Sequence, residues 1–219
     1  MAAGSSARME GTDKITAELA GEKVIVRSVR AFEENADIDE IVVVTRSGRL
    51  VEIAKLCSGF TKMKSVVCGG DTRAVSAYNG VMSVSADCTT VLIHDAARPL
   101  VSARIISETV KGAEKYGASV PCVKVKDTVK CVSGGFVQST PDRDGLVSAQ
   151  TPQGFKTELI KAALTDAVEK NAKITDDCSA LERMGMKIFV TEGDYENLKI
   201  TTPEDIDIAE AVLKRRLGR

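Results

Sequence analysis

The chain has 219 residues, of which 43% are hydrophobic and 28% charged, and its formal net charge is -1. This length and composition are typical of one globular domain, and so small a net charge argues against bulk attraction to nucleic acid or to a membrane surface. The apolar runs are too short to span a bilayer, and the N-terminus has neither the basic nor the long apolar region of a signal peptide.

The first part of the chain alternates between apolar runs and segments with helical spacing. In residues 24–35, for example, Ile25, Val29 and Phe32 recur at the spacing of one helix face. Continuous apolar strands between helices predict an α/β fold with a mostly parallel sheet that is covered on both faces. Helices are expected over 24–35, 50–56, 72–84 and 103–116, and strands over 40–45, 65–68, 90–94 and 118–125.

The alternation stops at residues 127–148, which contain two short β-like runs around Ser133 and Gly134. A glycine at such a turn favours a hairpin, so this segment is expected to leave the α/β body as an arm or lid. We predict one domain over 1–219, with the arm as an excursion from it. The β-like runs are 128–132 and 135–138; helices are expected over 156–170 and 175–184, a strand over 187–190, and a last helix from 202 onward.

Two of the later helices carry apparent start signals. Thr175 is expected to be the N-cap of its helix, with Asp176 and Asp177 in the first turn. Thr202 is expected to be the N-cap of the last helix, with Pro203 at the first helical position and two acids behind it.

The cysteines are scattered and include no C-x-x-C pair. Disulfides or a zinc site are therefore less expected than reduced, mostly buried thiols in a cytoplasmic protein. The six cysteines are Cys57, Cys68, Cys88, Cys122, Cys131 and Cys178.

The first fourteen residues have the composition of a phosphate-binding loop. Small residues around Gly4 let the backbone approach a ligand closely, and free N–H groups before a helix bind anions. Arg8 and Lys14 add two positive charges. These features together indicate a triphosphate cradle, although such loops normally follow a buried strand and this sequence starts inside the loop.

The run from His94 to Pro99 follows a buried strand directly, at the edge where open α/β sheets bind ligands. Asp95 and Arg98 are therefore candidate ligand-binding residues; the alternative is that they form an ion pair that braces a turn. His94 is the single histidine, and beside an apolar strand a packed role is favoured over a catalytic one.

Four further segments are weak signals when taken alone. Gly69-Gly70-Asp71 is also an ordinary strand-to-helix turn, and Thr151-Pro152-Gln153 is only a turn. The acids after Thr175 could hold a divalent cation or merely complement a helix dipole. Lys199, in the segment before the last helix, would by itself usually be solvated.

Taken in chain order, these segments follow one pattern, and the sequence resembles the 2-C-methyl-D-erythritol 4-phosphate cytidylyltransferase family over essentially its whole length. The runs 94–99 and 197–205 are the most specific to that family and its close relatives, whereas the glycine loop alone indicates only the wider nucleotidyltransferase superfamily. The segments are Gly4–Met9 with Lys14, Gly69–Arg73, His94–Pro99, Thr151–Gln153, Thr175–Asp177 and Asn197–Asp205.

The resemblance implies a Rossmann-like nucleotidyltransferase fold with a β-arm that interlocks two subunits in a homodimer. It implies a cytoplasmic transferase of the non-mevalonate isoprenoid pathway, which uses CTP and Mg²⁺ and releases pyrophosphate. The metal is expected to be held mainly by the CTP phosphates, with no assigned protein ligand. No nucleic acid or membrane partner is expected.

The resemblance also implies roles for individual residues. The residues expected around the phosphates, as the catalytic set, are Arg8, Lys14 and Lys199. Those expected to bind the nucleotide are Ala2, Ala3, Gly4, Gly70, Asp71, Ser76, Asp95 and Ala96. Those expected to bind the methylerythritol phosphate are Arg98, Thr128, Arg143, Thr151 and Thr175, of which Thr128 and Arg143 would reach the partner subunit's site from the arm.

The sequence departs from the family pattern at its start. The family's opening strand is not part of it, and Met1 stands where a proline usually precedes Ala-Ala-Gly. Without that central strand, several kcal/mol of apolar burial would be lost. One alternative function is therefore that of an inactive homologue that only binds CTP. A second is that of a pentitol-phosphate cytidylyltransferase that uses ribitol 5-phosphate, because it shares most of these motifs.

Overall fold

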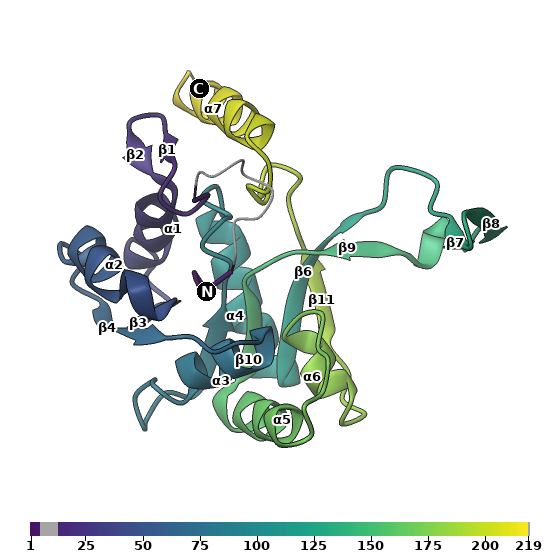
Figure 1. Ribbon diagram of the computed structural model, residues 1–219, viewed down its shortest axis with the longest axis horizontal. Coiled ribbons are helices and arrows are strands. Elements are labelled where there is room, and N and C mark those ends of the chain that lie inside the picture. The colour runs from purple at the N-terminus through teal and green to yellow at the C-terminus, as the bar shows by residue number, and fades with distance from the viewer. Residues whose placement is uncertain (5–12, 219) are drawn as a thin grey trace.

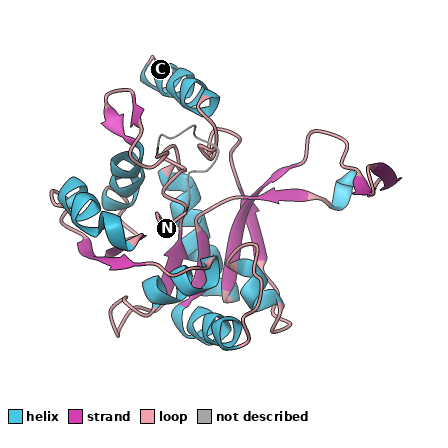
Figure 2. Ribbon diagram, viewed as in Figure 1, coloured by secondary structure: helices cyan, strands magenta, loops and turns pink. Residues whose placement is uncertain are grey.

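The strands at the centre of the molecule are covered on both sides by helices, as Figure 1 and Figure 2 show for the computed structural model. The structure describes residues 1–4 and 13–218. Strands β5 (Thr90–Ile93), β10 (Gln153–Lys156), β6 (Ala118–Lys124) and β11 (Phe189–Glu192) are neighbours in that order, and β9 (Val147–Ala149) pairs with β6. The parallel pair β3 (Ile41–Thr45) and β4 (Met63–Cys68) forms a separate sheet.

Most of the expected helices are present. Arg73–Val81, Thr157–Glu169 and Cys178–Glu182 (α3, α5 and α6) pack over one face of the central sheet, where Phe155 and Leu164 are fully buried. Ala103–Tyr116 (α4) packs over the other face through Ile105 and Ile106. The remaining helices are α1 (Val24–Glu33), α2 (Leu50–Cys57) and α7 (Glu204–Leu217). No helix among the described residues has the length and apolar character needed to cross a membrane.

The prediction of a mostly parallel sheet is wrong at its centre. Strand β10 lies between β5 and β6 and runs antiparallel to both, so the sheet is mixed. Its sequence includes Gly154, a weak strand former, but a side chain there would collide with Leu92 and Ser119 on the neighbouring strands. Gly154 therefore makes β10 hard to recognise as a strand from the sequence, and the same glycine allows β10 to fit between β5 and β6.

Two predicted helix starts are also wrong. Helix α6 begins at Cys178, because Ser179 donates its N–H to Asp176 and accepts the N–H of Thr175, which holds this stretch in a turn. The cap of α7 is Pro203 without a side-chain cap bond. Instead of Thr202 capping the helix, the Asp205 carboxylate accepts the N–H groups of Thr201 and Thr202.

The segment after β6 leaves the body as a long arm, as predicted, and Figure 1 shows it extending far from the rest of the molecule. Its tip is the hairpin of β7 (Cys131–Ser133) and β8 (Phe136–Ser139), whose turn residues Gly134 and Gly135 both have positive φ. Residues 128–130, expected to belong to the first strand, are outside it. The chain then returns along β9 to the edge of β6.

Two small hairpin strands, β1 (Glu18–Leu19) and β2 (Glu22–Lys23), precede α1 and were not expected. Ala20 and Gly21 form their turn with positive φ.

Candidate active site

A cavity of about 350 Å³ opens where the strands β3, β4 and β5 end at their carboxyl termini. Ligands of open α/β sheets bind at this edge because the loops that follow the strands meet there. Its lining consists of Met1, Ala2, Ala3, Gly4, Lys14, Ile15, Arg46, Gly70, Asp71, Thr72, Arg73, Ser76, Asp95, Ala97 and Lys199.

The cavity brings together most of the residues expected to bind the nucleotide or its phosphates. They come from opposite ends of the chain, from Ala2 to Lys199, so their meeting is a result of the fold. The predicted residues in the lining are Ala2, Ala3, Gly4, Lys14, Gly70, Asp71, Ser76, Asp95 and Lys199. Ala96, Arg98, Thr128, Arg143, Thr151 and Thr175 are not in the lining, and Arg8 lies outside the described residues.

The glycine loop after β4 is shaped by Ser76. The Ser76 hydroxyl accepts the N–H of Gly70 and donates to the carbonyl oxygen of the same residue. A side chain at Gly69 would collide with Ala3 and Ser76, and one at Gly70 would collide with Val75. The loop at Gly69 and Gly70 therefore packs closely against Ala3 and against the start of α3. The wall of the cavity here is main chain rather than side chain.

Asp95 is the centre of a charged cluster. One carboxylate oxygen lies 2.6 Å from the Lys199 ammonium, and the other lies 3.4 Å from the Arg73 guanidinium. Burial alone would raise the pKa of Asp95, but these two cations outweigh it and hold the pKa well below its usual range. Asp95 is therefore a fixed anion that orients Lys199 toward the cavity.

Arg73 also binds Asp177, which is fully buried. Burial would lower the pKa of Arg73, but Asp177 and Asp95 together raise it. Asp177, the N-cap residue of α6, is thus the buried ion-pair partner of Arg73. Among the residues that the structure describes, no three His, Cys, Asp or Glu side chains are grouped as metal ligands.

Lys199 is held by a turn that Arg98 and Thr151 support from behind. The Arg98 guanidinium donates to the carbonyl oxygen of Asn197 at 2.6 Å, and the Asn197 amide donates to the carbonyl oxygen of Thr151 at 3.0 Å. The N–H of Ile200 donates to Ala97 at 2.8 Å. The alternative prediction, that Asp95 and Arg98 form an ion pair that braces a turn, is wrong about the partner of Arg98. Arg98 does brace a turn, but it does so by donating to the carbonyl oxygen of Asn197.

His94 is packed, as predicted, and its ring is fixed in one neutral state. The carbonyl oxygen of Arg98 can only accept, so Nε2, at 3.1 Å, carries the ring proton and donates to it. In the neutral ring Nδ1 then accepts the Thr151 hydroxyl at 3.1 Å, while the Thr151 oxygen accepts the N–H of Asp95. Burial lowers the pKa of His94 to about 3, which removes it as a base at neutral pH.

This neutral state predicts a loss of stability in mild acid. The histidine of the unfolded chain takes up a proton as the pH falls through about 6.5, while the folded protein resists it down to about 3. The free energy of unfolding is expected to fall by about 2 kcal/mol between about pH 7.5 and 5 because of this residue. Asp95 contributes only below about pH 4, outside this window.

Urea unfolding of the wild type and of His94→Asn at the two pH values measures this contribution. The variant is expected to lose that part of the pH dependence. An equal pH dependence in both proteins would show that His94 is not its source.

Arg73 and Arg46 are lining residues to which the sequence analysis assigned no role, although Arg73 ends the segment Gly69–Arg73 that it singled out. Arg73 is the first residue of α3, where a cation opposes the helix dipole. A cation at the start of a helix could have pointed to this site in the sequence, because its unfavourable position implies a nearby carboxylate that holds it there. Arg46 follows β3 and pairs with Asp13 at 2.5 Å.

Comparison with known proteins gives consistent results over the full chain. A family model of 2-C-methyl-D-erythritol 4-phosphate cytidylyltransferase (IspD) matches residues 1–215. The protein of that name from Caldanaerobacter subterraneus subsp. tengcongensis is 43% identical over 224 residues, which cover 98% of this chain and 97% of the relative. The Geobacillus kaustophilus protein is 41% identical, with 100% of this chain and 96% of the relative covered.

Solved structures of the same family also resemble this chain over most of its length. The 4-diphosphocytidyl-2C-methyl-D-erythritol synthase of Anaerococcus prevotii superposes with a TM-score of 0.84 at 33% identity, covering 90% of this chain and 88% of that one. The 2-C-methyl-D-erythritol 4-phosphate cytidylyltransferase of Thermus thermophilus superposes with a TM-score of 0.80 at 29% identity, covering 92% and 94%.

Proposed function

The chain belongs to the 2-C-methyl-D-erythritol 4-phosphate cytidylyltransferase family, and from this premise we propose that the 350 Å³ cavity at the carboxyl ends of the strands binds CTP and methylerythritol phosphate. The enzyme transfers CMP from CTP to 2-C-methyl-D-erythritol 4-phosphate, a step of isoprenoid precursor biosynthesis. The products are 4-diphosphocytidyl-2-C-methyl-D-erythritol and pyrophosphate. The observation that carries the assignment of the site is that Lys14, Lys199 and the small-residue loop Ala2–Gly4 line one cavity.

We assign the nucleotide to the main-chain walls of this cavity. Ala2–Gly4 and the loop at Gly70 and Asp71 offer backbone groups without bulky side chains. Lys14 and Lys199 would face the triphosphate, with Arg8 from the same loop as a third cation. Ala96 lies behind this wall, where its N–H donates to Met1 and its carbonyl accepts from Ser28.

In the proposed reaction, an oxygen of the substrate phosphate attacks the α-phosphorus of CTP in line. A new P–O bond forms as the bond to the bridging α–β oxygen breaks, and the electron pair leaves with pyrophosphate. The attacking oxygen is already ionised, so no strong base is required, which agrees with the neutral, packed His94. The main barrier is the repulsion between two polyanions, which the lysine ammonium groups offset.

Positioning residues keep the Lys199 ammonium group in place. Asp95 fixes Lys199 by an ion pair, while Arg98 and Thr151 fix the turn that carries it. We therefore propose that Arg98 and Thr151 act on the reaction through Lys199. Thr128 and Thr175 are exposed, and contact with the acceptor substrate stays our proposal for both.

A divalent cation fits this site as a partner of the nucleotide phosphates. Both carboxylate oxygens of Asp95 are occupied by cations, and Mg²⁺ in nucleotide sites keeps several waters and binds mainly through phosphates. We propose Mg²⁺ held by CTP, with Asp95 in reach only through water. When bound, it would neutralise charge on the phosphates.

Pyrophosphate release in the presence of CTP and Mg²⁺ tests the function. Methylerythritol 4-phosphate and ribitol 5-phosphate are compared as acceptors, and release is expected with the first. Release with ribitol 5-phosphate alone would identify a pentitol-phosphate enzyme instead. Release with neither acceptor, in a protein whose melting temperature still rises with CTP, would identify a protein that binds the nucleotide without catalysis.

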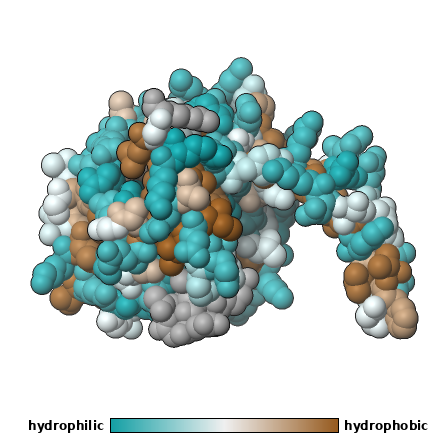
Figure 3. Space-filling view, turned by 90° about the horizontal axis from the view of Figure 1, so that it is seen from above, coloured by the Kyte–Doolittle hydropathy of each residue, from teal (hydrophilic) through white to brown (hydrophobic). Residues whose placement is uncertain are grey.

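The arm suits a dimer in which each chain completes the other's site. Val132, Phe136 and Val137 at its tip are exposed by 61, 75 and 59%, and Figure 3 shows apolar surface at the free end of the arm. An exposed apolar tip of this kind is typical of an association surface. We propose a homodimer with exchanged arms, in the cytoplasm, where the six thiols, all free here, remain reduced.

Arg143 lies at the base of the hairpin, exposed, with its guanidinium 2.8 Å from the carbonyl oxygen of Lys126. Its planar fork suits a substrate phosphate. Arg143→Ala is expected to raise KM for methylerythritol phosphate about 10- to 100-fold and to leave kcat nearly unchanged. Steady-state kinetics measure this, with Lys130→Ala on the same arm as the control. An unchanged KM would remove Arg143 from the acceptor site.

Mixed dimers test the exchange of arms. When inactive Lys14→Ala chains are refolded with Arg143→Ala chains, each mixed dimer contains one site with both residues intact. At a methylerythritol phosphate concentration well below KM, where Arg143→Ala chains alone have little activity, about a quarter of the wild-type activity per site is expected, since half of the dimers are mixed. No gain on mixing, in a preparation shown to contain mixed dimers, would mean that the arm serves its own chain.

A further inference from the structure

Arg46 lines the 350 Å³ cavity but has no part in the proposed reaction. It is the first residue after β3, and its side chain is 44% exposed. Two other lining cations, Lys199 and Arg73, are bound by Asp95. Lys14 is assigned to the triphosphate. What Arg46 does at this site therefore depends on the partner of its guanidinium.

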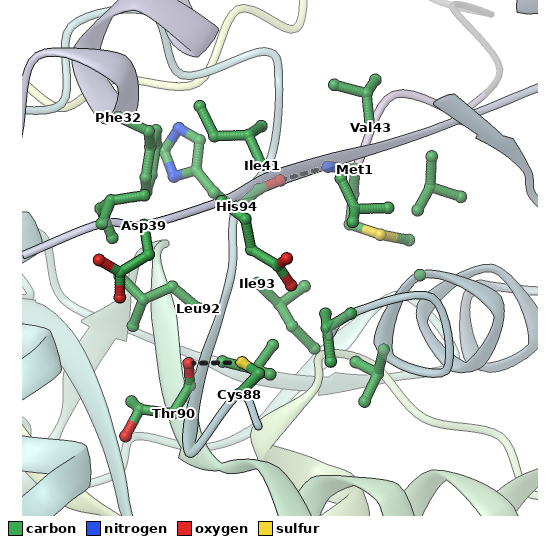
Figure 4. Close-up of a pocket in the computed structure, with 18 of the residues that line it drawn as sticks. Met1, Phe32, Asp39, Ile41, Val43, Cys88, Thr90, Leu92, Ile93 and His94 are labelled. Atoms are coloured by element: carbon green, nitrogen blue, oxygen red, sulfur yellow. Dashed lines mark hydrogen bonds between the residues drawn. The ribbon is translucent and has the colours of Figure 1, made fainter. Parts of the chain in front are cut away.

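The backbone at Arg46 lies between the two main-chain walls of the cavity. The small-residue loop follows Met1, whose nitrogen donates to the carbonyl oxygen of His94 at 2.6 Å, just after β5 (Figure 4). Ala2 then pairs in parallel with Thr45, the last residue of β3. Thr45 also pairs with β4, at the residue before the glycine loop. Arg46 is the next position along the chain, so the small-residue loop and the glycine loop pass on either side of it.

The Arg46 guanidinium is bound to Asp13, the residue before Lys14. It lies 2.5 Å from one oxygen of the Asp13 carboxylate, and Asp13 is its one ion-pair partner within the part of the chain that the structure describes. Lys14 lines the same cavity. The ion pair therefore turns the Arg46 guanidinium toward the part of the cavity that is assigned to the triphosphate.

Asp13 does not depend on Arg46 alone. The same carboxylate oxygen is also bound by Arg49, whose side chain is only 25% exposed and is not part of the lining. The other oxygen accepts the N–H of Ile15 at 3.1 Å. Asp13 thus keeps a cation and its turn when Arg46 leaves it. Because an ion pair with a half-exposed arginine contributes little to stability, the departure of Arg46 costs little.

A phosphate group is the natural competitor for this arginine. The planar guanidinium fork fits phosphate oxygens as well as it fits a carboxylate, and a triphosphate carries several negative charges where Asp13 carries one. We propose that Arg46 binds the β- or γ-phosphate of CTP, and that it exchanges Asp13 for this phosphate when the nucleotide enters. Arg46 would then stabilise the charge that leaves with pyrophosphate. The inference rests on the proposed function, because it requires CTP in this cavity.

Equilibrium titration with CTP in the presence of Mg²⁺, and displacement of CTP by CMP, test the assignment. Arg46→Ala is expected to weaken CTP binding about 10-fold. It should change CMP binding by less than about 2-fold, because CMP has neither the β- nor the γ-phosphate. The matched control is Arg104→Ala, which should bind both nucleotides as the wild type does. Arg104 is 43% exposed and pairs with Glu108 at 2.9 Å, outside the lining. An equal loss of affinity for CTP and CMP in Arg46→Ala would overturn the proposal.

Asp13→Asn separates phosphate binding from a structural role of the ion pair. Asparagine keeps an oxygen for the N–H of Ile15 but no longer competes for Arg46. The variant is expected to bind CTP as tightly as the wild type or up to about 5-fold more tightly. Weaker CTP binding in both Asp13→Asn and Arg46→Ala would mean that the pair shapes the loop, and would also overturn the proposal.

The same titrations distinguish this assignment from the proposed function. A wild-type protein that binds no CTP would overturn the proposed function, and the assignment of Arg46 with it. A wild-type protein that binds CTP, with an unchanged affinity in Arg46→Ala, would overturn the assignment of Arg46 alone.

Discussion

Lys14→Ala is expected to lower kcat/KM for CTP by about 100- to 1,000-fold in a protein that remains folded. Lys14 lines the same cavity as Gly4 and Lys199, where the proposed triphosphate carries its charge. Removing one preorganised charge that stabilises a transition state typically costs this much. The effect should fall mainly on kcat if Lys14 binds the charge that develops on the α-phosphate and pyrophosphate.

Steady-state pyrophosphate release measures the effect, and the circular dichroism spectrum checks the fold. Lys23→Ala is the matched control, because Lys23 lies on β2 in an exposed ion pair with Glu18, 3.9 Å away and outside the cavity. Lys14→Arg keeps the charge and should recover part of the activity. A Lys14→Ala enzyme with wild-type turnover would remove Lys14 from the mechanism.

Arg73→Met is expected to cost about 3 to 5 kcal/mol in the free energy of unfolding. Asp177 is fully buried, one of its carboxylate oxygens is bound by Arg73, and the other has no hydrogen-bond partner. Removing the cation therefore leaves a buried carboxyl group that must either carry an uncompensated charge or take up a proton, and both are costly. Replacing both partners avoids that penalty, so Arg73→Met combined with Asp177→Asn should cost clearly less than Arg73→Met alone.

Urea unfolding of the four proteins in this cycle measures the interaction. The single Arg73→Met variant should also become less stable as the pH rises. Burial raises the pKa of Asp177, and without Arg73 the folded protein holds a proton there that the unfolded chain releases at a lower pH. A cost below about 1 kcal/mol, with no pH dependence, would show that the pair is unimportant for stability.

Segments with a clear apolar period were predictable from the sequence. Helix α4 was predicted with the observed bounds, and α1 and β3 within two residues at each end, because their apolar positions repeat at 3.6 or run continuously. Strand β10 was not predictable, since four residues that include a glycine and a lysine have no strand pattern. Its existence depends on contacts with Leu92 and Ser119, which are remote in sequence.

The candidate site likewise has parts that could be predicted from the sequence and parts that could not. Asp95 was expected at the cavity because it follows a strand, and the carboxyl ends of neighbouring strands meet at one edge. The composition of the first loop pointed to Lys14, and the family resemblance alone pointed to Lys199; all three line one cavity. The orientation of side chains was not predictable. Arg98 faces a carbonyl group behind the cavity rather than Asp95. One of the two cations that pair with Asp95 is Arg73, which only the path of α3 brings near.

The place of β10 in the sheet has a consequence for the protein during its synthesis. Ile93 pairs with Gln153, and the β6 strand in between ends at Lys124. A nascent chain that has reached Lys124 therefore holds two central strands that cannot yet be joined. At about 5 to 20 residues per second, the ribosome needs about 2 to 6 s to deliver β10. During that interval the edges of β5 and β6 are open to other chains, and they are the expected target of any chaperone that binds this protein cotranslationally.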